Sequence, residues 1–512
     1  MRAQVLAVAT GCGVIAAALS LQSHATGSTQ ERARATRITW ADVTPLQSRL
    51  EARGLTAAAF PSHVAQLREA HARRVRDGDL DHLIFYLLQS KGFTSLPSIE
   101  PALSAKSLVD GLDGKERDAF LRGGDADPSR MSSAARSRLV TFLKALDAPA
   151  RDTRLLYFGE LVKATYPNAA ARESGLVREY FRVMRFVYQK EFVAQRSERP
   201  AEAVAALYRS RGLSTDTAVE AGYLVSIGLG ILKSLEPDRR IRRVLIVGPG
   251  LDLAPRTALL EAGPPESYQP WAVMDALVSH GLARLEELTV VAADINPRVV
   301  SHLRRARDRP PALTLVSEIP DSDAVTLSAE YRDYFAGLGR AIAVAHVPPV
   351  SGRGSGGHLR STLRVNPAAA RALDAESLDI VTDRLEGLTF DLVVATNILP
   401  YFDDGELMLA MANVAGMLAP GGVFLHNEAR ASLHDITTAL GFPAEQSRHA
   451  VIATVRGAPP LADSVWLHRK IIRGAPPLGL PYWLARGAPT PRSARQAHSL
   501  RSFAVSLGSF GR

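Results

Sequence analysis

The sequence predicts an α/β fold: a doubly wound, mostly parallel sheet preceded by an all-helical region. Short apolar, β-branched runs recur between residues 243 and 426 and are separated by segments with helical periodicity. This alternation is typical of a sheet whose two faces are both covered by helices. Residues 46–205 instead place apolar side chains at three- and four-residue intervals, which predicts helices alone.

The composition is that of an ordinary folded protein. The 512 residues are 46% hydrophobic and 22% charged, which is enough for two or three domains. The net charge is +9, but only eight of the 61 basic residues are Lys, and the Arg residues are scattered along the chain. A nucleic-acid surface concentrates its positive charge, and no RNA-binding signature is present, so the sequence argues against a nucleic-acid partner.

The first 25 residues have the pattern of a secretory signal peptide. Met1 and Arg2 precede an apolar run from Val5 to Leu21, and small residues stand at Ser23 and Ala25, where a signal peptidase reads. A membrane-anchoring or frayed helix is the alternative. Localisation depends on this choice: export if the signal is used, and the cytoplasm if it is not. No further transmembrane span is expected.

Cleavage after Ala25 would leave residues 26–45 as a polar, Arg-rich linker and would remove Cys12, the one cysteine. The remaining chain could then form no disulfide, zinc–thiolate site or cysteine nucleophile. We expect residues 46–205 to form a helical domain of five or six helices without a chemical motif. Residues 206–474 form the expected α/β domain, and residues 475–512, rich in Pro, Arg and Ser, form an expected flexible tail.

The central motif of the α/β domain is the run from Arg243 to Val247, which stops at Gly248-Pro249-Gly250. A buried strand that ends on glycines and is followed by a helix brings its backbone close to a nucleotide-like ligand. A second apolar run, Leu288 to Asp294, ends on an acid, which in doubly wound folds accepts hydrogen bonds from ribose hydroxyls. Further strands are expected at residues 390–396 and 421–426.

Three segments resemble the class I S-adenosylmethionine-dependent methyltransferases, nearest to the glutamate methyltransferases of chemotaxis receptors. They are Asp294-Ile295-Asn296-Pro297, Leu327 to Phe335 and Phe390 to Phe402, and the likeness covers residues 215 to 470. It implies a Rossmann-like, seven-stranded methyltransferase sheet with a C-terminal antiparallel hairpin. The alternating runs at residues 447–455 and 465–470 would supply that hairpin.

The resemblance also implies S-adenosylmethionine as the cofactor and a role for each candidate site residue. Gly248 and Gly250 would allow the backbone to approach the methionine moiety, Asp294 and Ile295 would contact the ribose, Asp383 the adenine, Asn397 the floor of the methyl-transfer site, and Tyr401 the acceptor. Asp383 follows residues 378–382, which we expect to form a short strand. The alternative for Asp383 is an ordinary turn former, and for Asn397 a cap at a strand exit.

The chain departs from the resembled pattern at two places. The family's turn after the first strand carries two glutamates before its proline, whereas this chain has Leu253 and Ala254 before Pro255. Asp252 is the candidate substitute as a partner for the cofactor's amino group. Thr396 stands where the family has Arg, which weakens the case for a receptor-glutamate substrate more than the case for cofactor binding.

Several other segments carry two interpretations. Residues 213–218 resemble a helix start whose Thr215 and Asp216, with Tyr223 further on, either contact the cofactor or only cap the helix. Tyr268 and Trp271 either line the substrate pocket or pin their loop. The turn-rich run from His346 to His358 lacks the ligand spacing of a metal site, so no metal is predicted.

The sequence therefore predicts methyl transfer from S-adenosylmethionine to an unidentified acceptor, either a small molecule or a protein side chain. Such a transfer requires alignment of donor and acceptor more than acid–base groups. The alternative is an exported, non-catalytic binding or structural protein that retains the fold. A nicotinamide oxidoreductase is disfavoured because Leu253 stands at the third glycine position of the dinucleotide motif.

Overall fold

The computed structural model describes residues 34–149, 152–253, 264–350 and 357–472. The expected signal peptide, the first part of the expected linker and the expected C-terminal tail lie outside these residues. No helix in the described ranges is long and apolar enough to cross a membrane.

The centre of the molecule is an eight-stranded mixed sheet with the order β5-β12-β13-β11-β10-β2-β3-β8. Its parallel strands are β2 (Arg243–Val247), β3 (Thr289–Asp294), β8 (Leu373–Ser377), β10 (Phe390–Ala395) and β11 (Leu418–His426). Three antiparallel strands follow at the other edge: β13 (Ala458–Arg469), β12 (Ala444–Val455) and β5 (Val325–Leu327). The sheet therefore has one strand more than the seven expected, because β5 adds to the free side of β12.

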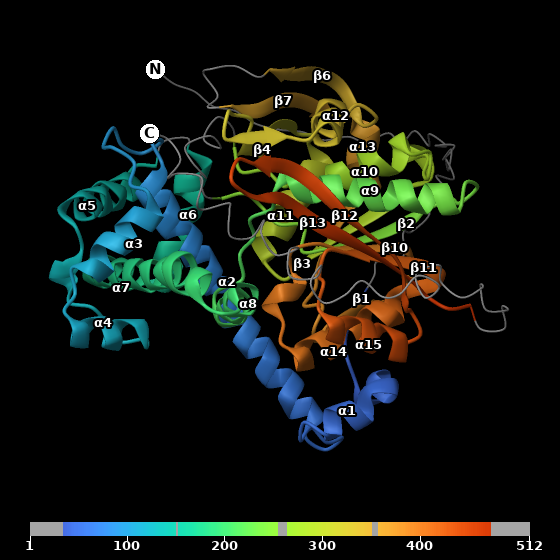
Figure 1. Cartoon of the computed structure of the whole chain (residues 1–512), viewed down its shortest axis with the longest axis horizontal. Helices are drawn as coiled ribbons and strands as arrows, with labels where there is room; N and C mark the ends of the chain where they lie inside the picture. The colour runs from blue at the N-terminus through green and yellow to red at the C-terminus, as the bar shows by residue number, and fades with distance from the viewer. Residues whose placement is uncertain (1–33, 150–151, 254–263, 351–356, 473–512) are drawn as a thin grey trace, which may run out of the picture.

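The parallel strands bury both faces, as their sequences predict. Val244 and Ile246 of β2 belong to one core cluster and Leu245 and Val247 to the other, because successive side chains of a strand point to opposite faces. Helices α9 (Val219–Leu235), α10 (Gln269–Ser279) and α11 (Pro297–Asp308) cover the first face, and α14 (Asp404–Met417) and α15 (Ala431–Ala439) the second. Figure 1 shows these two layers above and below the sheet.

The N-terminal helices form a bundle beside the sheet (Figure 1). They are α2 (Phe60–Gln89), α3 (Pro101–Asp110), α4 (Gly114–Leu121), α5 (Ser133–Asp147), α6 (Thr153–Thr165), α7 (Ala169–Tyr188), a π-helical turn (Gln189–Val193) and α8 (Pro200–Ser210). Buried Arg138 of α5 donates to the carbonyl oxygens of Leu87, Leu96 and Pro97 at 2.7, 2.8 and 3.0 Å. The arginine thereby satisfies carbonyls where α2 ends.

The segment expected as a linker is structured from residue 34 onwards. Strand β1 (Arg34–Arg37) pairs antiparallel with β9 (Asp383–Glu386), and a 3-10 helix (Trp40–Leu46) and α1 (Gln47–Glu51) follow. Ile38, Val43 and Leu46 are buried in the same core as α14, so their apolar side chains outweigh the polar composition of the stretch.

Helix α2 joins the two expected domains. Phe60 and Val64, near its start, are buried with α14 and the sheet, whereas Leu83 and Leu87, near its end, are buried in the core that the bundle shares. The boundary that the sequence predicts at residues 205 and 206 is therefore not a clean division, because one 30-residue helix contributes to both cores.

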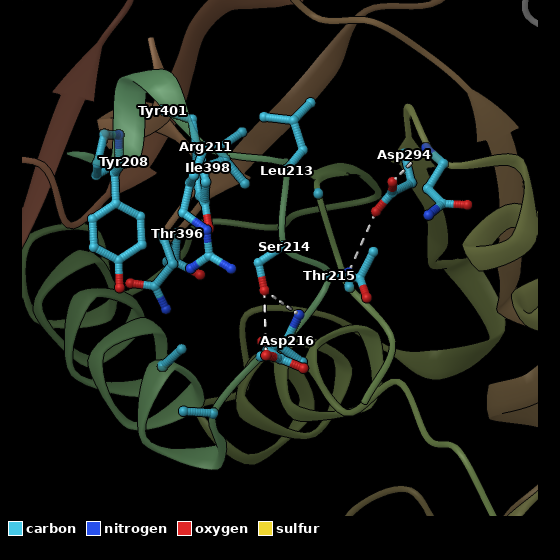
Figure 2. A pocket seen from close by; sticks show the side chains of 18 of the residues that line it. Tyr208, Arg211, Leu213, Ser214, Thr215, Asp216, Asp294, Thr396, Ile398 and Tyr401 are labelled. Atoms are coloured by element: carbon cyan, nitrogen blue, oxygen red, sulfur yellow. Dashed lines mark hydrogen bonds between the residues drawn. The ribbon is translucent and has the colours of Figure 1, made fainter. Parts of the chain in front are cut away.

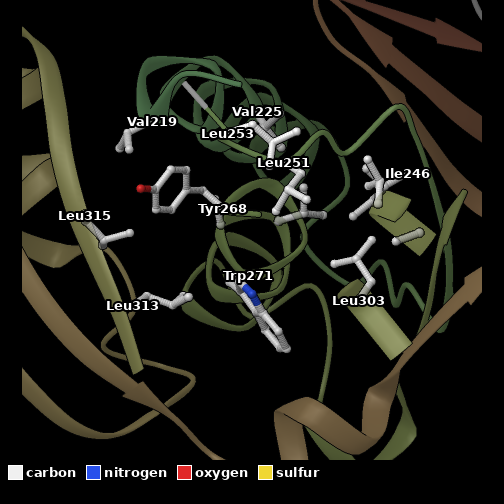
Figure 3. Close-up of a cluster of buried hydrophobic side chains, with 14 of the residues drawn as sticks. Val219, Val225, Ile246, Leu251, Leu253, Tyr268, Trp271, Leu303, Leu313 and Leu315 are labelled. Atoms are coloured by element: carbon white, nitrogen blue, oxygen red, sulfur yellow. The ribbon is translucent and has the colours of Figure 1, made fainter. Parts of the chain in front are cut away.

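A small three-stranded antiparallel sheet, order β4-β7-β6, lies beyond α10 (Figure 1). It consists of β4 (Ala312–Pro320), β6 (Ala343–Val350) and β7 (His358–Val365), with α12 (Ala329–Gly337) between the first two in sequence and α13 (Pro367–Ala372) after the last. The run from His346 to His358, which is turn-rich in sequence, thus includes the end of β6 and the first residue of β7. Tyr268 precedes α10 directly and Trp271 lies within it; both are buried in the core that Leu313 shares (Figure 3), and neither lines the cavity at the strand ends.

Candidate functional site

A cavity of about 300 Å³ lies at the carboxyl ends of the parallel strands, between the sheet and the helical bundle. Residues at the ends of four strands line it: Gly248 and Gly250 at β2, Asp294 to Asn296 at β3, Leu378 to Ile380 at β8, and Thr396 to Ile398 at β10. This is the edge at which doubly wound sheets bind ligands. Its volume is at the lower end of the range for small-molecule sites.

The glycine turn has the conformation that the sequence predicts. Gly248 and Gly250 have φ values of +66° and +75°, which residues with a side chain rarely adopt. A Cβ at Gly250 would collide with the carbonyl oxygen of Thr215. The close approach at Gly250 is therefore made by the chain itself. Thr215 Oγ1 donates to the carbonyl of Leu251, and the Leu251 N–H donates to the carbonyl of Thr215, both at 2.8 Å.

Residues 213–218 form no helix, contrary to the expected helix start, and α9 begins only at Val219. Thr215 and Asp216 line the cavity, in the stretch that Figure 2 shows between Asp294 and Tyr208. Tyr223 does not line it. Its ring packs instead against Tyr331 and Tyr334, with centroid distances of 5.4 and 5.3 Å.

Asp294 lies at the end of β3 and is almost fully buried. Its carboxylate accepts from the backbone N–H of Asn296 at 2.8 Å and of Gly250 at 3.4 Å. Burial raises the pKa of Asp294 to about 7, and these two donors oppose the rise. Each carboxylate oxygen keeps a lone pair, so the group can accept further hydrogen bonds from a ligand. Ile295, the next residue, also lines the cavity.

The structure places Asp383 elsewhere. Residues 378–382 form no strand, and Asp383 begins β9, where it is ion-paired with Arg68 and does not line the cavity. The acid that follows the third parallel strand at the cavity is Asp379. The sequence interpretation missed it because it placed the strand at residues 378–382 instead of 373–377. The alternation Leu373-Asp-Ala-Glu-Ser377, with an acid two residues later, was the available signal.

Asp379 is held by His71, which reaches the cavity from α2. Nδ1 of His71 lies 2.8 Å from Oδ2 of Asp379, and Nε2 lies 2.9 Å from Oε1 of Glu406. Burial lowers the pKa of His71, but its hydrogen bonds to the two carboxylates outweigh burial and raise the pKa to about 9. At neutral pH the imidazole is thus a cation between two carboxylates. Sequence reasoning offered no signal for this contact, since the three residues are far apart in the chain.

Asn397 follows β10 in a left-handed conformation, with a φ of 62°; no other non-glycine residue in the described ranges has positive φ. Asn427 holds it there: Asn397 N–H donates to Asn427 Oδ1 at 2.9 Å, and Asn427 Nδ2 donates to Asn397 Oδ1 at 2.8 Å. Asn427 Nδ2 also donates to Asp463 Oδ2 at 3.0 Å. Such strain, held by surrounding contacts, concentrates at functional sites.

Tyr401 lines the cavity with Tyr208 of α8, and the two rings meet edge to face at a centroid distance of 5.5 Å (Figure 2). Nη2 of Arg74 donates to the carbonyl of Tyr401 at 3.1 Å. Thr396 Oγ1 accepts from Nε2 of Gln269 at 2.6 Å. The helical bundle therefore supplies one wall of the site, which its sequence did not indicate.

Asp252 is not brought to the cavity. It is buried, and its backbone N–H donates to the carbonyl of Glu266 at 2.9 Å. Burial, together with the charge of Asp252, raises the pKa of Glu266 to about 8. The described residues contain no group of three or more His, Cys, Asp or Glu side chains suited to a metal ion.

No protein-family model matches the chain. No curated protein matches its sequence. Solved structures that resemble it in part include the N-methyltransferase NodS from Bradyrhizobium japonicum, 14% identical over 48% of this chain and 94% of that chain, with a TM-score of 0.24. Magnesium protoporphyrin IX methyltransferase from Synechocystis is 8% identical over 49% and 84%, with a TM-score of 0.26. A TehB-like methyltransferase from Corynebacterium glutamicum is 11% identical over 53% and 98%, with a TM-score of 0.25. These values establish no family for the chain.

Proposed function

We propose that the protein is an S-adenosylmethionine-dependent methyltransferase whose cofactor binds in the cavity at the carboxyl ends of β2, β3, β8 and β10. The observation that carries the proposal is the position of buried Asp294 beside the glycine turn, with hydrogen-bonding capacity left over. The strand order supports it as well, because β13 runs antiparallel between β11 and β12, as the resemblance to class I methyltransferases predicts.

The residues present fit a nucleoside. Asp294 would accept from the ribose hydroxyls, and Leu378 and Ile380 would cover the faces of the adenine, with Asp379 as the acceptor for its amino group in place of Asp383. Oδ1 of Asp379 already accepts from Val381 N–H at 3.1 Å, and Oδ2 is bonded to His71, so the side chain is held ready. Fixed side chains of this kind bind with little loss of conformational entropy.

The methionine end of the cofactor would lie along residues 215–217, beside the glycine turn. Asp216 and Thr217 line the cavity there, and Thr217 lies against Gly250. The bound cofactor supplies an electrophilic methyl group on a sulfonium. The protein has to align that group with an acceptor and exclude water, which the helical bundle does by covering the strand ends. Asn397 and Tyr401 would border the acceptor.

Titration calorimetry of the full chain with S-adenosylmethionine, S-adenosylhomocysteine and NAD tests the proposal. We expect the first two to bind with a stoichiometry near one and NAD not to bind. Asp294→Asn should weaken S-adenosylhomocysteine binding about tenfold or more, because an amide N–H donor replaces one of the two acceptor oxygens that would face the ribose hydroxyls. The matched change Asp308→Asn, at the exposed end of α11, should leave binding unchanged. Binding of NAD alone would contradict the proposal.

The second candidate is a non-catalytic binding or structural protein that retains the fold. One observation favours it: the carbonyl of Thr215 already occupies the space above Gly250, where a ligand would approach. Failure of a folded, full-length protein to bind either methyl donor or product would favour this candidate. A receptor-glutamate acceptor is not adopted, since Thr396 replaces the family's Arg and its hydroxyl is bonded to Gln269.

A further inference from the structure

Beside the cavity lies a groove of about 1080 Å³ that the proposed function does not use. It is bordered by β1, α2, the end of α6, the start of α11 and the segment after β8. Asn296 and Asp379 line both the groove and the cavity, so the two adjoin at the end proposed for the nucleoside. The volume reaches the upper end of the range for small-molecule sites, so the groove has room for a ligand of its own.

Five arginines line the groove, although they come from three segments that are far apart in the sequence. Strand β1 supplies Arg34 and Arg37, α2 supplies Arg68 and Arg76, and the start of α11 supplies Arg298. The residues of α2 that line the groove follow one another at three- and four-residue intervals, so they share one face of the helix. The fold therefore gathers positive charge that the sequence disperses.

Three aspartates also line the groove, and each of them has a cation as its partner. Asp79 pairs with Arg298 at 2.9 Å, Asp383 with Arg68, and Asp379 with His71 at 2.8 Å. His71 is charged at neutral pH, because its hydrogen bonds to two carboxylates outweigh burial and raise its pKa to about 9. Five arginines against three aspartates leave an excess of two positive charges among the lining residues.

Arg34 and Arg37 of β1 carry most of this excess. Both are exposed, and neither forms an ion pair with a residue in the ranges that the structure describes. Arg37 is attracted to Asp383, which is already paired with α2. Glu386 lies opposite Arg34 in the strand pair, but it is 3.5 Å from Arg384. The guanidinium groups of β1 are therefore available to an anionic ligand.

Arg298 is a cation that the protein already holds in position. Its Nη1 donates to Oδ2 of Asp79 at 2.9 Å, and its guanidinium lies over the ring of Tyr157, 4.7 Å from the centroid. Oδ1 of Asp79 accepts from Nδ2 of Asn296 at 2.9 Å, and the N–H of Asn296 donates to Asp294 in the cavity at 2.8 Å. A guanidinium has five N–H donors, so an ion pair through one nitrogen leaves donors for a ligand. A fixed cation also loses little conformational entropy on binding.

The chemistry of the groove favours a phosphate group. Arginine side chains bind phosphate oxygens through parallel N–H···O bonds. A phosphate monoester carries a charge of about −1.5 to −2 at neutral pH, which matches the excess of positive charge better than the single charge of a carboxylate or a sulfate ester. No aromatic side chain of the described residues lines the groove, so it lacks a surface on which the bases of a single-stranded nucleic acid stack.

We propose that the groove binds an organic phosphate monoester, whose phosphate is held by Arg34, Arg37 and Arg298. The organic part lies along the small side chains that line the groove, Ala72 of α2 and Ala164 of α6. This site goes beyond the proposed function, because it does not require a methyl donor in the cavity.

Titration calorimetry of the full chain with phenyl phosphate, phenyl sulfate and inorganic phosphate tests the inference, without a methyl donor and at about 0.15 M salt. We expect phenyl phosphate to bind with a stoichiometry near one. It should bind about tenfold or more tightly than phenyl sulfate, which has the same shape and a smaller charge. Inorganic phosphate should bind more weakly than the ester, because it lacks the organic part. Equal binding of the two esters, no binding of phenyl phosphate, or binding of inorganic phosphate as tight as that of the ester would overturn the inference.

A double variant, Arg34→Gln with Arg37→Gln, should weaken the binding of phenyl phosphate about tenfold or more. The matched double variant, Arg305→Gln with Arg309→Gln at the exposed far end of α11, removes the same charge and should leave the affinity unchanged. All four side chains are exposed, so both proteins should fold. Retained affinity in the β1 variant, or an equal loss in the two variants, would overturn the inference.

A short oligothymidylate is titrated in parallel. If it binds more tightly than phenyl phosphate and the β1 variant abolishes that binding, the groove belongs to a nucleic acid and the inference fails. S-adenosylhomocysteine is titrated separately. The methyltransferase proposal can therefore fail while phenyl phosphate still binds, and the groove can fail while the methyltransferase proposal stands.

Discussion

Two buried histidine sites, one at the cavity and one in the sheet, differ in charge. His71, on α2 at the cavity, contacts two carboxylates and has its pKa raised to about 9. His468, on β13, has its pKa lowered to about 3 by burial and by neighbouring His434. Its Nε2 lies 2.8 Å from Nε2 of His426, whose pKa is also lowered well below the usual value. Burial is similar in the two places, so it does not decide the charge.

The hydrogen-bond partners of each histidine decide its charge. His468 Nδ1 lies 3.2 Å from the carbonyl of Phe442, and His426 Nδ1 accepts from the N–H of Glu428 at 3.1 Å. A donor Nδ1 on His468 makes its Nε2 an acceptor, and an acceptor Nδ1 on His426 makes its Nε2 a donor, so the pair is satisfied when neutral. His71 has only carboxylates to bind and is satisfied when charged. A neutral pair suits the sheet core, and an ion pair positions α2 against the cavity.

The largest expected effect follows from removal of His71. His71→Ala leaves Asp379 and Glu406 buried without their shared cation, and breaking a buried ion pair in this way costs about 3–5 kcal/mol. Urea unfolding should show a loss of that size in the free energy of unfolding. His449→Ala, at an exposed position on β12, should change it by less than about 0.5 kcal/mol. Equal losses in the two variants would contradict a stabilising ion pair at His71.

A fall in pH should destabilise the protein through His468. The folded pKa of His468, about 3, lies below the value of about 6.5 in the unfolded chain, so the unfolded state binds the proton first. The contribution of this histidine is complete above pH 6.5 and is lost as the pH falls toward 3, by roughly 5 kcal/mol in total. Unfolding measured between pH 6.5 and 4 should therefore show a shallower slope in His468→Leu than in the wild type. An unchanged slope would show that the stability lost in acid comes from groups other than His468.

A rise in pH should destabilise the protein through His71. This pH dependence has the opposite sign to that at His468, and the expected loss of stability is smaller. Its folded pKa of about 9 lies above the unfolded value, so its contribution is complete below pH 6.5 and is lost as the pH rises through 9. The total is about 3 kcal/mol. The raised pKa values of Asp294 and Glu266, about 7 and about 8, also make the folded protein less stable as the pH rises. The contribution of His71 is therefore measured as the difference between a variant and the wild type. Glu406→Gln should lower the pKa of His71 and move the loss to lower pH. A curve that coincides with the wild type would contradict this.

Much of the α/β fold could be predicted from local pattern. The runs that form β2, β3 and β10 are apolar and β-branched, and such a run is buried on both faces wherever it is placed in a parallel sheet. The position of Asp294 at a strand end follows from the same pattern, because the acid directly terminates the run. The cofactor, its acceptor and the role of each site residue stay predictions.

Other features were decided by contacts between distant segments. Strand β9 exists because β1 pairs with it, and Asp383 is drawn to Arg68 on α2 instead of to the cavity. The resulting shift puts Asp379 at the cavity, where His71 fixes it. No periodicity within residues 378–383 contains that information, since strand boundaries depend on hydrogen bonds to another strand.

The sequence by itself determined where β2, β3 and β10 form and which acid follows β3, because these depend on side-chain spacing over a few residues. Only the tertiary structure decided that α2 spans two cores and that the helical bundle forms one wall of the cavity. The physical reason is that burial, pKa and hydrogen-bond satisfaction belong to the environment of a group, and here that environment is assembled from segments hundreds of residues apart.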